Sequence, residues 1–363
     1  MYINKYKLTE IAIIVCSWIL ALLLFAYLKF GDFNDTFLFE LYGTEMVSKK
    51  AIYIFALKYG LIVGLLFSLL HIYVYPKIIK NPSFAKNIIA RTICFLICFK
   101  IAVNILTSSY FGFESLIIDN ENQRKSLQTL FIYSVLINFL IDFFLLMIKN
   151  LGPEYFFNLI RGKYYRPREE NRIFMFLDLA SSTTIAERIG HIAYSSLLQD
   201  CFRELTPLLL KNNASIYQYV GDEAVITWKI NKNTNRGQCM DLFFSFQERL
   251  QQKKDYFLQK YNTAPFFRSS INEGRIVMST VGEIKTEIVY HGDVLNTAAR
   301  IQSLCKTYNS ELLISENFYQ NIKEEKIYKF KCFNNISLIG KNEKINIYNV
   351  NELGNNEKHE MEK

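Results

Sequence analysis

The sequence contains little of what marks several protein classes. Glycine and proline are scarce, at 15 and 6 of 363 residues, which excludes a collagen-like chain. Half of the residues are hydrophobic and 15% are aromatic, which is too apolar for an intrinsically disordered protein. No internal repeat is present. The hydrophobic residues are unevenly distributed, because nearly all long apolar runs lie before residue 150. We therefore expect a membrane region followed by a globular region.

The cysteines show neither a disulfide framework nor a zinc-type spacing with histidine. Their number is odd and their positions are scattered, which favours a reducing cytosol. Cys94 and Cys98 are four residues apart in an apolar run, and we interpret them as small apolar residues of a helix interface rather than as a redox or metal pair. The full set is Cys16, Cys94, Cys98, Cys201, Cys239, Cys305 and Cys332.

The chain also lacks a long block of lysine and arginine. Its net charge of +8 is spread over the sequence, and we expect no nucleic-acid partner. A membrane protein accumulates basic residues on its cytoplasmic side, which explains the excess of positive charge.

Four apolar stretches reach the roughly 20 residues that a bilayer requires. The first contains an apolar run that is too long for a signal peptide and is followed by no small-residue cleavage site. Residues 1–150 are thus predicted to form a four-helix transmembrane bundle in contact with the lipid bilayer. The spans are expected at 9–29, 52–75, 88–108 and 128–148.

The charges of the connecting segments predict the orientation. The segment after the first span is mainly acidic, whereas basic residues follow the second and fourth spans, as in cytoplasmic loops. We expect a multi-pass protein of the inner (plasma) membrane whose N-terminus and globular region are cytoplasmic. The charges are Asp32, Asp35, Glu40 and Glu45 after the first span, Lys77, Lys80 and Lys86 after the second, and Lys149, Arg161 and Lys163 after the fourth.

Charged residues within the spans are costly and frequently functional. In an antiparallel hairpin of the third and fourth spans, Asp142 lies between the levels of Arg91 and Lys100 and could pair with either. We favour a buried ion pair over a sensing role. His71 is expected to reach the membrane interface rather than to bind haem.

The second half of the chain alternates short strands with helices. We expect a juxtamembrane coupling segment at residues 151–170, one globular domain at residues 171–352, and a disordered polar tail at residues 353–363. The element order β-α-β-β-α-β predicts an α+β ferredoxin-like domain. Strands are expected at 173–177, 214–220, 223–229, 267–271 and 287–290, and helices at 184–211, 240–260 and 293–305.

Two aspartates lie where predicted strands end. Asp178 follows a buried strand, and Asp222 lies in a hairpin turn. Carboxylates on neighbouring strands can hold two Mg²⁺ ions together with substrate phosphates. Ser182 and Thr183 begin the next helix, where backbone N–H groups suit a phosphate, although both residues could simply cap the helix.

A second group of residues follows Gly292. Asn296 and Arg300 are four residues apart on a predicted helix, so their side chains project from one face. This placement suits an Asn that holds a ribose and an Arg that neutralises a phosphoryl group. A solvated helix face is the alternative.

These motifs carry a resemblance to a known family. Phe-Leu-Asp178, Tyr-Val-Gly-Asp222 and Gly-Asp-Val-Leu-Asn296-Thr-Ala-Ala-Arg300 resemble the catalytic domain of class III adenylate/guanylate cyclases in its bacterial form, over about residues 170–350. The resemblance implies that Asp178 and Asp222 bind two Mg²⁺ or Mn²⁺ ions per site. It also implies that Asn296 and Arg300 contact the ribose and the α-phosphate.

The same resemblance implies the reaction and the assembly. A nucleoside triphosphate is converted to its 3′,5′-cyclic monophosphate and pyrophosphate, at sites formed between two catalytic domains. Because this chain carries both the aspartates and the Asn/Arg pair, the resemblance implies a homodimer with two equivalent sites.

The sequence departs from the family pattern at the base and phosphate contacts. Gln218 stands where adenylate cyclases of the family usually carry lysine, and Val289 stands at the position of the second base-reading residue. A phosphate-binding lysine aligns with Ile339, and Lys341 is a candidate replacement. We expect ATP as the substrate and cyclic AMP as the product, with GTP as the runner-up, because an amide can donate and accept hydrogen bonds.

Three alternatives stay open at this point. The chain could be a guanylate cyclase, or a non-catalytic nucleotide-binding receptor with a degenerate cyclase domain. Val220–Gly221–Asp222–Glu223–Ala224 also partly matches a diguanylate cyclase signature, but that reading leaves Asn296 and Arg300 unexplained. Glu223 is either a further metal ligand or a strand residue.

Overall fold

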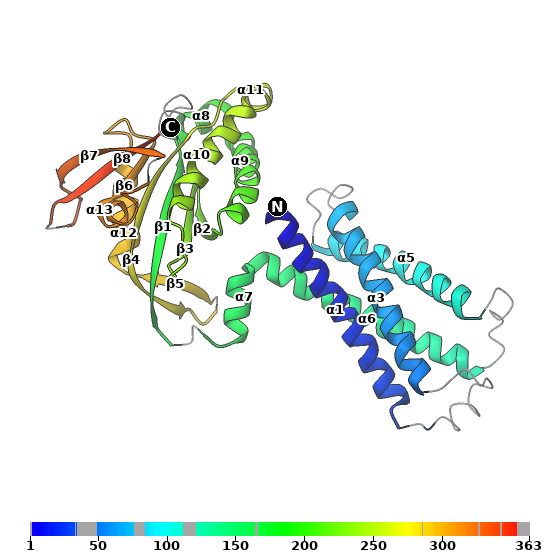
Figure 1. Cartoon of the computed structure of the whole chain (residues 1–363). Coiled ribbons are helices and arrows are strands. Elements are labelled where there is room, and N and C mark those ends of the chain that lie inside the picture. The colour runs from blue at the N-terminus through cyan, green and yellow to red at the C-terminus, as the bar shows by residue number, and fades with distance from the viewer. Residues whose placement is uncertain are drawn as a thin grey trace, which may run out of the picture. The chain divides into compact units, whose positions relative to one another are not determined.

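The computed structural model describes residues 2–32, 34, 49–75, 84–111, 121–163, 166–284, 286–325, 327–341 and 343–353. The tail beyond residue 353 and many of the loop charges used to predict the orientation lie outside these residues. The chain divides into two compact units, Ile3–Ile160 and Arg161–Lys363 (Figure 1).

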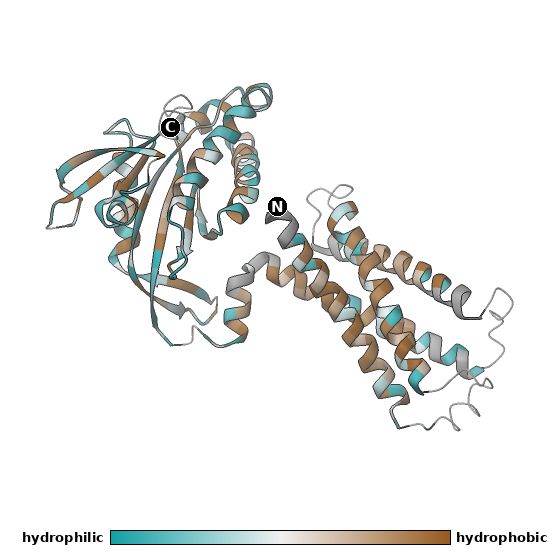
Figure 2. Ribbon diagram, in the orientation of Figure 1, coloured by the Kyte–Doolittle hydropathy of each residue, from teal (hydrophilic) through white to brown (hydrophobic). Residues whose placement is uncertain are grey.

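The first unit is helical and predominantly hydrophobic (Figure 2). The described residues contain three helices long and apolar enough to cross a membrane, at Lys7–Phe30, Lys49–Val74 and Gln128–Ile148, which match three of the predicted spans. The predicted span at 88–108 lies within α5, which is not one of these three, so a four-span bundle stays a prediction. The elements are α1 (Tyr2–Phe30), α3 (Lys49–Leu69), the π-helical turn η1 (Leu70–Val74), α5 (Phe84–Phe111), α6 (Glu121–Leu151) and α7 (Pro153–Ile160).

Helices α1 and α3 pack closely because α3 carries glycine at their contact. A Cβ atom at Gly60 would lie 2.8 Å from Ile19 Cα, and one at Gly64 would lie 2.9 Å from Val15 Cα. Small residues four apart allow helix backbones to approach in this way. Trp18 stacks on Phe95 of α5 at 5.1 Å between ring centroids and extends the same contact.

Two of the charged residues within the predicted spans form a buried ion pair. Arg91 Nη1 lies 3.3 Å from Asp142 Oδ1, and Asn138 donates to the other carboxylate oxygen, whereas Lys100 is exposed. Arg91 is therefore the partner of Asp142. His71 is buried in η1 with its Nε2 atom 3.4 Å from Glu10, so its side chain contacts α1, and its level relative to a membrane interface stays a prediction.

The second unit contains an eight-stranded mixed sheet. Its strand order is β2-β3-β1-β4-β6-β8-β7, with β5 paired to β4. β1 pairs antiparallel with both β3 and β4, and β4 pairs parallel with β6. The elements are β1 (Arg168–Leu179), α8 (Ser182–Ile189), α9 (His191–Lys211), β2 (Ser215–Val220), β3 (Glu223–Lys229), α10 (Gly237–Gln252), α11 (Lys254–Tyr261), β4 (Phe267–Val281), β5 (Glu287–His291), α12 (Asp293–Leu304), β6 (Leu312–Ser315), α13 (Glu316–Gln320), β7 (Tyr328–Ile336) and β8 (Ile345–Glu352).

The predicted β-α-β-β-α-β order is found in β1 to β4, but several elements differ from the expectation. The single helix expected over 184–211 is two helices, because Gly190 adopts φ +79° between them. The helix expected over 240–260 is interrupted at Lys253. β1 and β4 are longer than expected because they continue to pair with each other beyond the core.

Alternation along β1 gives the sheet two buried faces. Ile173 and Met175 point into a large core with α9 and α10, whereas Phe174 and Phe176 point into a smaller core with α12. Because side chains of a strand alternate between faces, Asp178 is placed on the face that α12 covers.

Candidate active site

The two aspartates lie at the end of the β1–β3 pair. Asp178 is opposite Glu223, the first residue of β3, and Asp222 directly precedes Glu223 in the β2–β3 turn. The turn and the strand register therefore bring together two carboxylates that are more than forty residues apart in the sequence.

The carboxylates of this site affect one another. Burial raises the pKa of Asp178 to about 6, and the negative charge of Asp222 adds to that effect. Burial also raises the pKa of Glu223 to about 7, again with a contribution from both aspartates. Concentrated negative charge of this kind favours a bound cation.

A pocket of about 390 Å³ opens beside Asp178. The residues from Leu179 to Thr184, which include Ser182 and Thr183 at the start of α8, form one side of it. The other side is formed by Arg268 of β4 and by Gln302, Ser303 and Lys306 at the end of α12. The pocket thus combines a carboxylate, a helix N-terminus and two cationic side chains, which suits a phosphate chain with a divalent ion.

Asn296 and Arg300 lie on a different flank of α12. Asn296 is exposed and Arg300 is half-buried, and neither is among the described residues that line the pocket. At 100° per residue, these side chains point well away from that of Gln302. The structure therefore groups the predicted site residues into two sets within one chain.

The second set includes Lys341. Its Nζ atom lies 2.6 Å from Asp293 Oδ2 at the start of α12. The preceding residue, Gly340, packs on Arg300, since a Cβ atom there would lie 3.2 Å from Arg300 Nη2. Arg300, Asn296 and Lys341 consequently share one end of the domain, where they present two cations and an amide.

The expected base-reading residues lie on separate strands. Gln218 is exposed on β2 opposite Val225, and Val289 is half-buried on β5 opposite Ser279. Their neighbours are in contact, because the rings of Tyr217 and Tyr290 lie 4.6 Å apart. The buried guanidinium of Arg172 lies over Tyr290 at 5.1 Å and supports that pair.

Four pocket residues were missed in the sequence, namely Arg268, Gln302, Ser303 and Lys306. Gln302 and Ser303 lie in the motif helix, six and seven residues after Asn296, which was the available signal. Arg268 and Lys306 have no sequence signal that distinguishes them from other basic residues. Arg268 enters the site because the β1–β4 register places it opposite Asp178.

The residues present fit a divalent metal ion. Asp178 and Asp222 supply only oxygen donors, and their mutual repulsion would be relieved by a cation. Within the part of the chain that is described, no group of three or more His, Cys, Asp and Glu side chains is arranged to hold an ion. Phosphate oxygens of a substrate would complete the coordination of Mg²⁺ at such a site.

The second unit matches a known protein family. The family model of the adenylate and guanylate cyclase catalytic domain matches residues 164–352, about half of the chain. The chain belongs to the class III adenylate/guanylate cyclases. The match covers both sets of residues described above and does not extend to the helical first unit.

The similar proteins agree on the family. Adenylate cyclase 2 of Rhizobium meliloti (strain 1021) is 34% identical over 181 residues, which are 50% of this chain and 50% of that protein. The adenylate cyclase of Anabaena cylindrica is 26% identical over 184 residues, 48% of this chain and 36% of that protein. The chain thus spans half or less of the length of these curated relatives. The structure of a bacterial light-regulated adenylyl cyclase shares the fold, with a TM-score of 0.51 and 15% identity over 60% of this chain and 64% of that one.

Proposed function

We propose that this protein is a membrane-anchored adenylate cyclase that converts ATP to 3′,5′-cyclic AMP and pyrophosphate, at sites shared by two copies of the chain. The observation that carries the proposal is the separation of the two residue sets. Asp178 lines the phosphate-sized pocket, whereas Asn296 and Arg300 face away from it. A second copy that placed its Asn296 and Arg300 over the pocket would complete the site, and symmetry would complete the second one.

Asp178 and Asp222 are the residues that would hold two Mg²⁺ or Mn²⁺ ions. Metal ions at such a site supply Lewis-acid stabilisation of the charge on the phosphoryl group and lower the pKa of the attacking hydroxyl. The backbone N–H groups at the start of α8 and the side chains of Arg268 and Lys306 would bind the β- and γ-phosphates.

The partner chain would supply the groups at the reacting end. Its Asn296 would orient the ribose so that the 3′-hydroxyl faces the α-phosphorus, and its Arg300 would stabilise the charge of the transition state. The bond from the 3′-oxygen to the α-phosphorus forms while the bond to the bridging oxygen of pyrophosphate breaks. The hydroxyl proton leaves to solvent.

ATP is the proposed substrate because the similar curated proteins are named adenylate cyclases. Gln218 offers an exposed amide on β2. It can donate to and accept from adenine. The three apolar helices support anchoring in the membrane, which would hold the catalytic units of two chains close together.

Product formation tests this proposal. Purified full-length protein is offered ATP or GTP with Mn²⁺, and wild type is compared with Asp222→Ala, Arg300→Ala and the control Asp255→Ala, which alters an exposed acid of α11. We expect cyclic AMP from wild type and the control, and at least about a 100-fold loss in the two site variants. Cyclic GMP alone would overturn the choice of substrate. Bound nucleotide without any cyclic product would favour a non-catalytic receptor.

A further inference from the structure

Gln302 contacts one of the two candidate metal-binding carboxylates directly. Its Nε2 atom donates a hydrogen bond to Asp178 Oδ2 at 2.9 Å. The two residues are 124 positions apart in the sequence and come from α12 and β1. The Asp178 carboxylate also interacts with the Leu179 backbone N–H and with Asp222. An amide nitrogen only donates, so the Gln302 bond occupies one of the roughly four lone-pair sites of the carboxylate and leaves others for a metal ion.

The helix that carries Gln302 is fixed on the sheet at two points. Ser270 Oγ donates to the Ala298 carbonyl oxygen at 2.7 Å, and Asn272 Nδ2 donates to the Val294 carbonyl oxygen at 2.9 Å. Both donors are buried on β4, the strand next to β1. These two hydrogen bonds fix the helix turns that precede Gln302 on the strand next to β1.

We propose that Gln302 is a positioning residue for metal binding, which orients the Asp178 carboxylate of its own chain toward the metal ions. This inference rests on the proposed function, because it assigns Asp178 as a metal ligand. Residues that hydrogen-bond to a metal ligand fix its orientation, and their removal weakens metal affinity by about 10–100-fold. The assignment differs from those of Asn296 and Arg300, which lie on another flank of the same helix.

The first test measures metal binding without turnover. Mn²⁺ is titrated into the full-length protein without nucleotide, and free Mn²⁺ is followed by electron paramagnetic resonance. We expect Gln302→Leu to weaken Mn²⁺ binding about tenfold. Gln302→Asn keeps an amide that is too short to reach Asp178 and should behave in the same way. The matched control is Gln251→Leu on the exposed face of α10, which should bind Mn²⁺ as wild type does.

The second test separates positioning from general destabilisation. In a mixed dimer of an Asp222→Ala chain and an Arg300→Ala chain, the one complete site takes its aspartates from the Arg300→Ala chain. Gln302→Leu added to that chain should raise the Mn²⁺ concentration for half-maximal activity about tenfold. The same change in the Asp222→Ala chain should leave this concentration unchanged, because it affects only the inactive site.

Each outcome decides the proposal. Unchanged Mn²⁺ affinity in both Gln302 variants would overturn it, as would equal effects in the two mixed dimers, which would indicate a structural role. If wild type binds Mn²⁺ but makes no cyclic nucleotide, the proposed function fails while the first test still decides the role of Gln302.

Discussion

Lys341 Nζ lies 2.6 Å from Asp293 Oδ2, and this ion pair holds the turn before β8 against the start of α12. Burial raises the pKa of Asp293, but hydrogen bonds from Lys341 and Thr297 and the positive charges of Lys341 and Arg300 outweigh burial and hold this pKa below its usual range. Arg300 adjoins the same turn through Gly340. The ion pair therefore places the Lys341 ammonium group beside Arg300, the proposed transition-state arginine. A nucleotide triphosphate bound there would compete with Asp293 for the Lys341 ammonium group.

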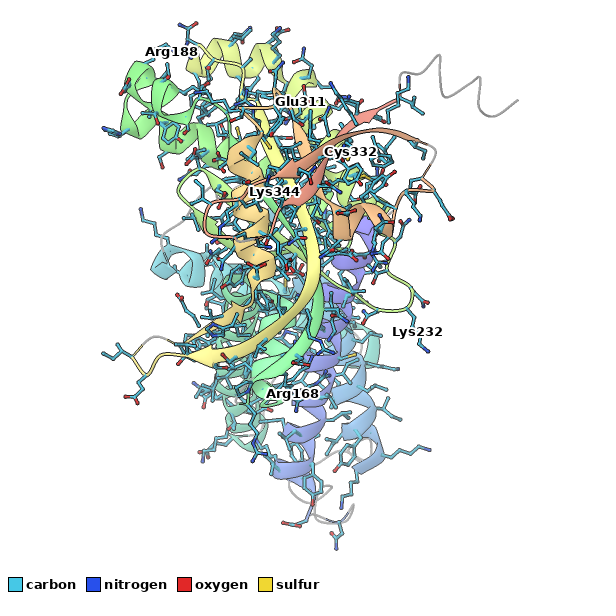
Figure 3. The ribbon with its side chains drawn as sticks, turned by 90° about the vertical axis from the view of Figure 1, so that its left-hand side faces the viewer. Arg168, Arg188, Lys232, Glu311, Cys332 and Lys344 are labelled. Carbon is cyan, nitrogen blue, oxygen red and sulfur yellow. The ribbon has the colours of Figure 1, made fainter. Side chains whose placement is uncertain are left out.

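Lys341→Ala should lower kcat/KM for ATP. A charge-assisted hydrogen bond to a phosphate contributes about 1.5–3 kcal/mol, so we expect kcat/KM for ATP to fall about 10–100-fold. Steady-state kinetics of the purified protein measures the effect. The matched control is Lys344→Ala, which removes an exposed lysine three residues further along (Figure 3). Equal kinetics for wild type and Lys341→Ala would exclude a role of Lys341 in phosphate binding.

Gln218→Ala should reduce the preference for one base. Gln218 is exposed on β2, so its truncation leaves no cavity and no unpaired buried group in the domain. If its amide contacts the base, the ratio of kcat/KM for ATP to that for GTP should fall about tenfold, the value of one hydrogen bond. Competition of ATP and GTP for the same enzyme measures the ratio directly. A ratio that does not change would assign base selection to other residues.

The strands and helices around the site could be predicted from the sequence, whereas the last three strands of the sheet could not. The β2–β3 hairpin was predictable because two short runs rich in β-branched, aromatic and other apolar residues flank a Gly-Asp turn, and both strands are found. No strand was predicted after Cys305, although β6, β7 and β8 complete the sheet. β7 lies at the sheet edge, and its alternation is short: exposed Lys329 and Lys331 alternate with Tyr328 and Phe330, but Cys332, Asn334 and Asn335 are exposed and break the pattern. Its place depends on pairing with β8, which local composition does not reveal.

For the site, too, the sequence predicts the motif residues but not the contacts that depend on how distant elements pack. Motifs indicated these residues because Asp178 ends a buried strand, Asp222 lies in a hairpin turn, and Asn296 and Arg300 share one face of a helix. The contact between Gln302 and Asp178 depends on how α12 docks on the sheet, and no pattern in the sequence encodes that docking. The sequence also could not show that Lys341 pairs with Asp293, since the two residues come from distant segments.

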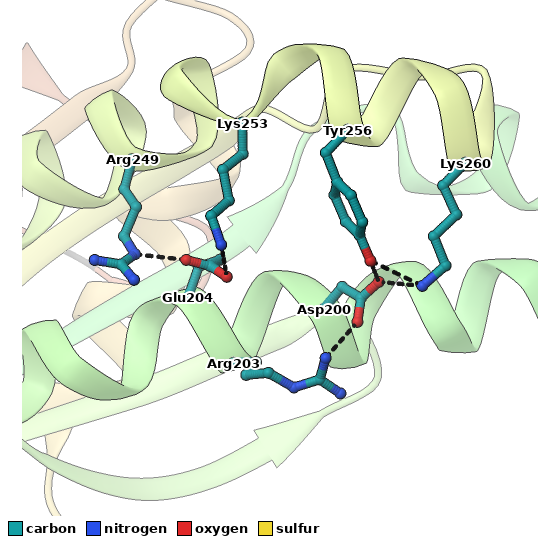
Figure 4. Close-up of polar contacts among 7 residues, drawn as sticks. All are labelled: Asp200, Arg203, Glu204, Arg249, Lys253, Tyr256 and Lys260. Carbon is teal, nitrogen blue, oxygen red and sulfur yellow. Dashed lines mark hydrogen bonds and ion pairs between the residues drawn. The ribbon is translucent and has the colours of Figure 1, made fainter. Parts of the chain in front are cut away.

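Asp200 forms a polar cluster that joins α9 to α11 (Figure 4). Its carboxylate accepts hydrogen bonds from Tyr256, Lys260 and Tyr261 at 2.6–2.7 Å, and from Arg203 at 3.0 Å. Asp200→Asn weakens these bonds and should destabilise the catalytic unit by about 2 kcal/mol, or roughly 4–8 °C in Tm. Fluorescence of Trp228 after Trp18→Phe reports this unit alone, because the chain has only these two tryptophans.

The stabilisation by Asp200 should depend on pH. Burial raises its pKa, but the hydrogen bonds from Lys260, Tyr261 and Tyr256 outweigh burial and bring the pKa to about 2, below the value of about 3.9 in an unfolded chain. Stability from such a depressed carboxylate is present above the unfolded pKa and is lost as pH falls from about 4 to about 2. The difference in Tm between wild type and Asp200→Asn should therefore shrink between pH 6 and pH 3. A constant difference would contradict this assignment.

Loss of either Arg91 or Asp142 alone should destabilise the helical unit more than loss of both residues together. Removal of one partner leaves a buried charge, so Asp142→Leu and Arg91→Leu should each cost about 3–5 kcal/mol. Replacement of both by leucine removes both charges and should restore most of the loss. Lys100→Leu is the control, because Lys100 is exposed and should not contribute to the pair.

Trp18 fluorescence in a Trp228→Phe background reports thermal unfolding of this unit in detergent. If the double variant is as unstable as the sum of the single variants, the two charges act independently and the pairing is not what holds α5 to α6.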